Sequence, residues 1–142
     1  MKPAQSGHVP GEPSDAERLR EASDRVEPLE STCPYSLAAP LAPAVAARLE
    51  GRRIELERIL DAARALASRH DLLVVEGAGG LLVPLTERET YADLAVALAL
   101  PVILVARAGL GTVNHAALTA EALRRRGLEL AAIVLNRTTP ED

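Results

Sequence analysis

The stretch Val74-Val75-Glu76-Gly77-Ala78-Gly79-Gly80 decides the fold class of this 142-residue chain. It completes a short apolar run that begins at Leu72, and such a run predicts a strand over 72–76 that is buried on both faces. The strand ends in a carboxylate and in glycines, which let the backbone turn tightly beside a bulky group. In open α/β sheets, ligands bind just beyond the carboxyl ends of the strands. A carboxylate at that place suits a magnesium ion held against phosphates, and a surface turn with a solvent-facing Glu76 is the alternative.

Strand and helix alternate through the second half of the chain. Apolar runs predict further short strands over 101–106 and 130–135, the former buried, and helical spacing predicts helices over 90–98 and 114–126. This order implies parallel pairing with right-handed crossovers. The sequence therefore predicts an α/β fold with a doubly wound parallel sheet.

The first half is expected to hold three helices and one long irregular segment. Residues 25–43 contain four prolines, at positions 28, 34, 40 and 43, and so long a loop inside a compact domain is usually functional or disordered. The helices are expected over 16–22, with Ser14 or Asp15 near its start, over 43–49, with Pro43 in its first turn, and over 54–69, with Ile59, Leu60, Ala63 and Leu66 on its apolar face.

Composition limits the classes of function. With 48% hydrophobic residues and a net charge of −4, residues 1–142 are expected to form one soluble globular domain or part of one. This mild acidity gives no electrostatic footprint for nucleic acid or an anionic membrane, and no apolar run approaches the roughly 20 residues that span a bilayer. The single Cys33 excludes an internal disulfide framework and fits a reducing cytoplasm.

Several segments, in the same order along the chain, resemble the dethiobiotin synthetases, ATP-dependent enzymes that close the ureido ring in biotin synthesis. Lys2-Pro3 with Ser6-Gly7 resembles the family's Lys-Pro-x-x-[Ser/Thr]-Gly segment, and Val74–Gly80 resembles its acidic glycine-rich loop. Residues 25–43, with Pro34-Tyr35, resemble its substrate-side loop. The segments 100–119 and 127–137 are the strongest matches.

The resemblance implies a reaction between 7,8-diaminononanoate, carbon dioxide and ATP. A carbamate forms on one amine, is phosphorylated to a carbamic-phosphoric anhydride, and is then attacked by the second amine. Because the substrate itself is the nucleophile, the protein has to position the reactants, hold Mg²⁺ and neutralise charge on the phosphoryl oxygens. The resemblance also implies a P-loop NTPase type of fold and a cytoplasmic homodimer.

By this resemblance, the first half of the chain supplies the reacting centre. Lys2 matches the family's catalytic lysine, and Ser6 would hydrogen-bond the substrate. Asp15 and Glu76 match the two magnesium ligands, although a helix cap is an equally open reading of Asp15. The residues expected at ATP in this half are Asp15, Glu76, Gly77, Ala78 and Gly79.

The second half would supply two further contacts. The turn Gly111-Thr112-Val113-Asn114 leads into a helix whose free N–H groups favour an anion, and in the family this turn meets the substrate carboxylate from the second subunit. Asn136 matches the residue that binds the adenine edge, with Arg137 beside it, and a simple turn former is the alternative for Asn136. His115 is expected to pack or cap rather than act in catalysis.

The P-loop pattern G-x-x-x-x-G-K-[ST] occurs nowhere in the sequence. The family's fold begins with a strand and this loop, so the sheet is expected to be incomplete and the chain to be a fragment of a longer protein. Because the phosphate-binding loop is missing, we expect these 142 residues alone to catalyse negligible ATP-dependent ring closure. Two other readings are a related P-loop ATPase or amidoligase domain, and a degenerate non-enzymatic domain that dimerises.

Overall fold

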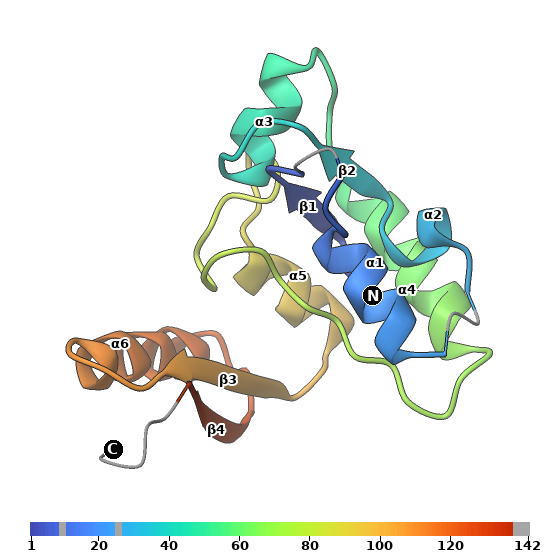
Figure 1. The fold of residues 1–142 in the computed structure, drawn as a ribbon. Coiled ribbons are helices and arrows are strands. Elements are labelled where there is room, and N and C mark those ends of the chain that lie inside the picture. Colours follow the sequence, from blue (N-terminus) through green and yellow to red (C-terminus); the bar gives the residue numbers. More distant parts are fainter. Residues whose placement is uncertain (9–10, 25–26, 138–142) are drawn as a thin grey trace. The chain divides into compact units, whose positions relative to one another are not determined.

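The computed structural model describes residues 1–8, 11–24 and 27–137, which fall into two compact units, 1–94 and 95 onward. Each unit holds one two-stranded parallel sheet (Figure 1). In the first unit, β1 (Ala4–Ser6) pairs with β2 (Tyr35–Leu37), and in the second, β3 (Val102–Arg107) pairs with β4 (Leu130–Asn136). Parallel strands combined with helices confirm the α/β class.

The helices of the first unit follow the predicted order, with one addition. They are α1 (Asp15–Ala22), α2 (Leu29–Thr32), α3 (Pro43–Leu49), α4 (Leu56–Ala67) and α5 (Tyr91–Leu98), the last of which extends across the boundary of the unit. The structure confirms the helices expected near 16–22, 43–49, 54–69 and 90–98, within one or two residues at most ends.

Helix α1 begins where the sequence places a cap. The Ser14 hydroxyl accepts a hydrogen bond from the backbone N–H of Glu17 at 3.2 Å, and the Glu17 carboxylate accepts one from the Ser14 N–H at 2.7 Å. This reciprocal capping box satisfies two N–H groups that the first turn would otherwise leave unpaired. Ser14, rather than Asp15, is therefore the cap.

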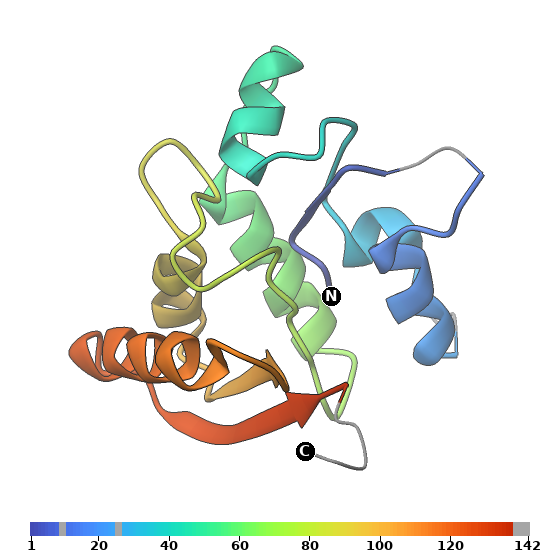
Figure 2. The same cartoon turned by 60° about the vertical axis from the view of Figure 1, so that its left-hand side comes forward.

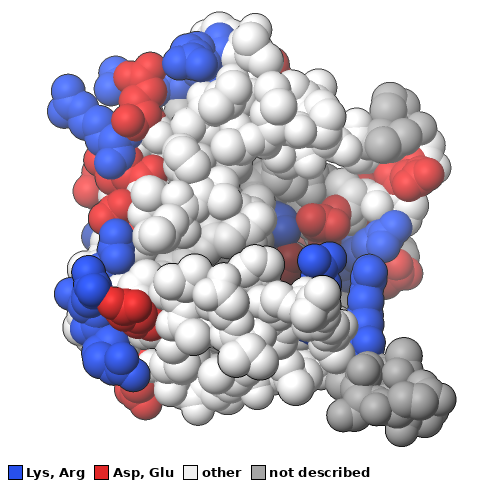
Figure 3. All heavy atoms as spheres, turned by 90° about the vertical axis from the view of Figure 1, so that its left-hand side faces the viewer, with Lys and Arg blue, Asp and Glu red and all other residues white. Residues whose placement is uncertain are grey.

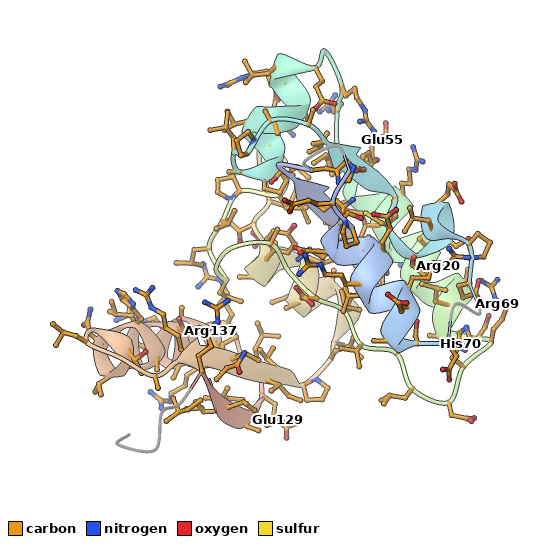
Figure 4. The ribbon with its side chains drawn as sticks, viewed as in Figure 1. Arg20, Glu55, Arg69, His70, Glu129 and Arg137 are labelled. Atoms are coloured by element: carbon orange, nitrogen blue, oxygen red, sulfur yellow. The ribbon has the colours of Figure 1, made fainter. Side chains whose placement is uncertain are left out.

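Helix α4 buries the apolar face that its periodicity predicts. Its buried residues are Ile59, Leu60, Ala63 and Leu66. Arg69 and His70 follow the end of α4. Arg69 Nη2 forms an ion pair with the Glu27 carboxylate at 3.0 Å, and His70 Nε2 lies 2.8 Å from the same carboxylate. Arg20 of α1 donates to the Glu27 backbone carbonyl at 2.7 Å. Figure 4 labels Arg20, Arg69 and His70. Their contacts with Glu27 connect α1 and the end of α4 to the chain before α2.

The prediction of a strand over 72–76 is wrong. The segment belongs to no helix or strand, and Leu72 and Val74 are 79% and 64% exposed. Its described backbone bonds run to Met1, which donates to the Val74 carbonyl at 2.7 Å and accepts from the Glu76 N–H at 2.9 Å. A parallel strand is buried on both faces only when neighbours flank it on both sides and helices cover it, whereas the backbone bonds described for this segment run to Met1 alone.

Residues 25–26 lie outside the part of the chain that the structure describes. Residues 27–43 contain more regular structure than their prolines predict. They contain α2 and β2, and β2 gives β1 its partner through the register pairs Ala4–Tyr35 and Gln5–Ser36. The prolines flank these elements rather than interrupt them. Lys2 lies just before β1.

The second unit is a strand–helix–strand arrangement (Figure 2), in which α6 (Thr112–Arg125) packs against both β3 and β4. The helix begins at Thr112, two residues earlier than predicted, because Gly111 adopts φ +91° and starts the first turn. The expectation that the 101–106 strand is buried is wrong, since Ile103 and Val105 are each 61% exposed. One helix covers one face of a sheet, and alternate side chains point to the other face.

The surface charges agree with the composition. On the face drawn in Figure 3, basic and acidic side chains of the described residues are interspersed and do not gather into one basic patch. Among the helices in the described part of the chain, none combines the length and the apolar character that crossing a membrane requires.

Candidate functional site

Lys2 lies at the centre of a charged cluster in the first unit. Its ammonium Nζ lies 2.8 Å from Glu76 Oε1, 3.1 Å from Asp15 Oδ2 and 3.1 Å from the Gly77 carbonyl oxygen. Three segments far apart in the sequence supply these groups: the residues before β1, the first turn of α1 and the loop that follows 72–75. The structure thus brings together the lysine and both carboxylates that the sequence predicts for catalysis and metal binding.

The lysine of this cluster is buried, whereas its partners are open to solvent. The Lys2 side chain is 4% exposed, compared with 63% for Asp15 and 49% for Glu76. Burial disfavours the charged ammonium, but the hydrogen bonds to Glu76 and Asp15 outweigh burial and raise the pKa of Lys2 above its ordinary value of 10.5. Lys2 is therefore a fixed cation, held with its charge beside two carboxylates that solutes can reach.

The loop after Glu76 needs two of its glycines, Gly77 and Gly79, for space. At Gly77 a Cβ would lie 3.3 Å from the ring of Tyr91, a buried residue of α5 whose hydroxyl donates to the Ala4 carbonyl oxygen. At Gly79 it would lie 2.9 Å from Val83 Cγ2, and φ there is +76°. Glycine thus permits this loop to fold against the core beside the Lys2 cluster.

Ser6 and Asp15 both line a hollow of about 180 Å³ next to this cluster. The sequence analysis missed four of its polar side chains, which are Gln5, His8, Glu12 and Arg18. The residues that line the hollow are Gln5, Ser6, Gly7, His8, Glu12, Pro13, Ser14, Asp15 and Arg18. The strand–helix succession is the signal that could have found them, since it places the end of β1 and the start of α1 beside each other.

The predicted contacts of the second unit lie at the carboxyl ends of its parallel strands. Arg107 at the end of β3 is in register with Asn136 at the end of β4, and the Ala108 N–H donates to the Asn136 carbonyl at 3.0 Å. The turn after β3 places Gly111 before α6 and Thr112, Val113 and Asn114 in its first turn. The Thr112 hydroxyl donates to the Arg107 carbonyl.

Asn136 also shows the features of a turn former. Its Oδ1 accepts a hydrogen bond from the Arg137 N–H at 2.9 Å, and Arg137 has the left-handed φ of +58°. Both residues are exposed, and Figure 4 labels Arg137 just beyond β4, with Glu129 just before that strand. The turn and an adenine contact remain compatible, because the amide nitrogen of Asn136 is not used in this bond. His115 is exposed; its backbone N–H donates to the Gly111 carbonyl, and its own carbonyl accepts a hydrogen bond from the Thr119 hydroxyl.

A magnesium ion fits this first-unit cluster only together with other ligands. Within the described residues there is no group of three or more His, Cys, Asp or Glu side chains that could hold a metal ion by themselves. Asp15 and Glu76 each contribute one oxygen to Lys2, which leaves the second oxygen of each carboxylate for a cation. One or two carboxylates completed by water and phosphate oxygens is the set that Mg²⁺ prefers beside a nucleotide.

Cys33 is buried and lacks the features of a nucleophile. Burial raises the pKa of its thiol to about 11, so the thiolate that reacts is scarce at neutral pH.

The whole chain, residues 1–142, matches a family model described as an AAA domain, in agreement with the predicted P-loop NTPase type of α/β fold. It is similar to the ATP-dependent dethiobiotin synthetase BioD of Anaeromyxobacter dehalogenans (strain 2CP-1), with 79% identity over 142 residues, which are 100% of this chain and 64% of that protein. The protein of the same name from Ralstonia nicotianae is 46% identical over 140 residues, 96% of this chain and 61% of the relative. The chain therefore spans slightly less than two thirds of the length of these curated relatives.

Proposed function

Because this chain belongs to the AAA domain family, we propose that it is part of an ATP-dependent dethiobiotin synthetase. The enzyme would close the ureido ring of dethiobiotin from 7,8-diaminononanoate, carbon dioxide and ATP. The relatives' name and their 46–79% identity support this reaction. A cytoplasmic location belongs to the same proposal, as a thiol that is single and buried requires no oxidising compartment.

The convergence of Lys2, Asp15 and Glu76 is the observation that carries the proposal. Phosphoryl transfer needs a fixed cation and carboxylates for a metal rather than a protein nucleophile. A buried lysine between two accessible carboxylates has this composition. Lys2 would neutralise charge that develops on carbamate and γ-phosphate oxygens, in a site where a preorganised cation costs no reorganisation during the reaction.

Asp15 and Glu76 would hold Mg²⁺, which would supply Lewis-acid stabilisation to the phosphate oxygens when bound. The backbone of Gly77, Ala78 and Gly79 would lie along ATP, where the absence of side chains at the glycines permits close approach. Ser6, which lines the adjacent hollow, would hydrogen-bond the diamine.

The first turn of α6 would bind the carboxylate end of the substrate. Gly111, Thr112, Val113 and Asn114 carry no charge, but the free N–H groups of a helix start attract an anion. The Thr112 N–H already donates to the Gly109 carbonyl at 3.1 Å, so the N–H groups of Val113 and Asn114 would make this contact. We propose that this turn acts on the site of a second subunit in a homodimer. Asn136 and Arg137 would bind the nucleotide base.

The direct test is a chimera in which this chain replaces the 142 matching residues of the Anaeromyxobacter dehalogenans relative. We expect the chimera to form dethiobiotin, and Lys2→Met to lower kcat about a hundredfold to a thousandfold, since a preorganised charge is lost. Arg64→Met is a matched control, because Arg64 forms an exposed ion pair with Asp61 on α4. A Lys2→Met rate within a few-fold of the unmodified chimera would refute the role of Lys2.

Subunit mixing tests the shared site. One chimera carries Lys2→Met and the other Asn114→Ala, and the two are mixed under conditions in which exchange is verified with differently tagged subunits. A mixed dimer would contain one site with both residues intact, so at diamine concentrations well below KM the rate of the mixture should rise above that of either parent. A mixture whose rate stays at the average of the two parents would exclude the shared site.

A further inference from the structure

Local contacts determine the residue at which α1 begins, but they do not determine where the helix lies in the molecule. The capping box of Ser14 and Glu17 determines where the helix begins. A capping box satisfies groups within one turn, so it does not determine which part of the fold that turn lies against. Asp15 reaches Lys2 only if this turn is held beside β1.

The Gln5 side chain joins these two elements. Gln5 is the middle residue of β1 and is 5% exposed. Its Oε1 accepts a buried hydrogen bond from the Ala16 N–H at 3.0 Å, and its Nε2 donates to Ser36 Oγ on β2 at 3.0 Å. Both ends of the amide are therefore used, one on the helix and one on the neighbouring strand.

Asp15 has little else to hold it. Its side chain is 63% exposed, and among the described residues its one ion pair is with Lys2. The next residue, Ala16, is 1% exposed, and its N–H is the group bonded to Gln5. Fixing the peptide N–H of Ala16 fixes the residue before it, because the two share a planar peptide unit.

We propose that Gln5 is a positioning residue that holds Asp15 beside Lys2. The inference deepens the proposed function and rests on it, since Asp15 is there a magnesium ligand. A glutamine suits this task because its amide carries an acceptor for the helix and donors for the strand. An apolar side chain of the same length would leave the buried Ala16 N–H unpaired, and the first turn of α1 would have to move to regain a partner.

The first measurement reports position without any metal. Lys2 is the only lysine of this chain, so its signals in the lysine-labelled chimera are assigned by their loss in Lys2→Arg. We expect a nuclear Overhauser contact between the Lys2 ε protons and the Asp15 β protons. This contact should disappear in Gln5→Met and persist in Gln5→Glu, whose carboxylate can still accept from Ala16.

Ser36→Ala is the matched control, because it removes the partner of Gln5 Nε2 and leaves the bond to Ala16. The contact should persist in this variant. Its persistence in Gln5→Met, or its loss in Ser36→Ala, would overturn the proposal. If Gln5→Met does not fold, Gln5→Asn replaces it, because the shorter side chain keeps the amide but cannot reach Ala16, and the same loss is expected.

The second measurement separates this inference from the proposed function. Mn²⁺ affinity is determined by electron paramagnetic resonance in the presence of a non-hydrolysable ATP analogue. We expect Gln5→Met to weaken Mn²⁺ binding roughly tenfold, as loss of a group that orients a ligand does, with no further loss in the double variant with Asp15→Asn.

The two readouts fail independently. If Asp15→Asn leaves Mn²⁺ affinity unchanged while the proton contact behaves as expected, the metal role of Asp15 is refuted and Gln5 remains its positioning residue. If Asp15→Asn weakens Mn²⁺ binding but Gln5→Met changes neither readout, the positioning role is refuted and the proposed metal site stands.

Discussion

The first unit encloses a core, whereas the second exposes most of its apolar side chains. Nearly all buried side chains described belong to residues 1–94, and Leu123 is the buried one in the second unit. In β4, Ile133, Val134 and Leu135 are 45–53% exposed. The exposed segment 72–75 of the first unit is equally apolar. Apolar strand sequence therefore does not by itself produce burial, which depends on what covers each face.

The candidate contacts of the two units are built in different ways. In the first unit, long-range side-chain contacts bring Lys2 to Asp15 and Glu76. In the second unit, local backbone conformation at Gly111 and Arg137 shapes the turns after the strands. Changes of charge should thus dominate in the first unit, and changes of backbone or helix start in the second.

After the loss of the Lys2 charge, the largest expected effect is the loss of a carboxylate from the charge network of the first unit. Glu76→Gln keeps the shape of the side chain and removes its charge. Losing a charged metal ligand should lower the rate of the chimera at limiting Mg²⁺ by roughly a hundredfold, about 2.7 kcal/mol at the transition state. Glu55→Gln, at an exposed position before α4 (Figure 4), is the control. Steady-state rates over a range of Mg²⁺ concentrations measure this effect. An unchanged rate would refute the metal role of Glu76 and favour the alternative of a solvent-facing side chain in a surface turn.

The next prediction tests whether backbone conformation also contributes to the stability of the first unit. Gly79→Ala must accept φ +76° and a Cβ 2.9 Å from Val83 Cγ2, which should lower the free energy of unfolding by about 1–3 kcal/mol. Gly80→Ala is matched, because its Cβ meets nothing within 4 Å, and it should change stability by less than about 0.5 kcal/mol. Urea unfolding of both variants checks this, and equal midpoints would contradict it.

A smaller effect is expected in the second unit. Asn114→Ala should raise KM for the diamine about tenfold and leave KM for ATP nearly unchanged, because it loses about one hydrogen bond to the carboxylate end of the substrate. Thr119→Ala, further along α6, is the control. Parallel changes in both KM values would show that Asn114 acts through the fold rather than through the substrate.

The smallest effect concerns pH and the polar contacts of Glu27. His70 and then Arg69 lower the pKa of Glu27 below its ordinary value of 4.5. A lowered folded-state pKa stabilises the fold above the unfolded value, and this stabilisation is lost as the pH falls through the folded value. Glu27→Gln should therefore destabilise at pH 7, and the difference from the unmodified chain should shrink below about pH 4.5.

Urea midpoints at pH 7 and pH 3.5 measure this difference. Glu129→Gln, before β4 (Figure 4), is a control without a described ion pair. A difference that grows on acidification would contradict the sign.

Local pattern predicted the helices well because their determinants are local. The cap at Ser14 and the apolar face of α4 both depend on residues within one or a few turns. The 72–76 strand was wrong for the opposite reason, since a strand exists only through partners that its own sequence does not specify. Strand β1 was missed because three residues between Pro3 and Gly7 show no period.

The sequence by itself determined the α/β class, the helix starts and, through family resemblance, the three charged residues of the candidate site. Only the tertiary structure decided that Lys2, Asp15 and Glu76 meet around one ammonium, that Lys2 is buried while the carboxylates are open, and that Gln5 joins β1 to α1. Helices and caps are held by neighbours in the chain, which a sequence pattern displays. Contacts between residues 74 positions apart exist only after the intervening chain has packed, and no local pattern encodes them.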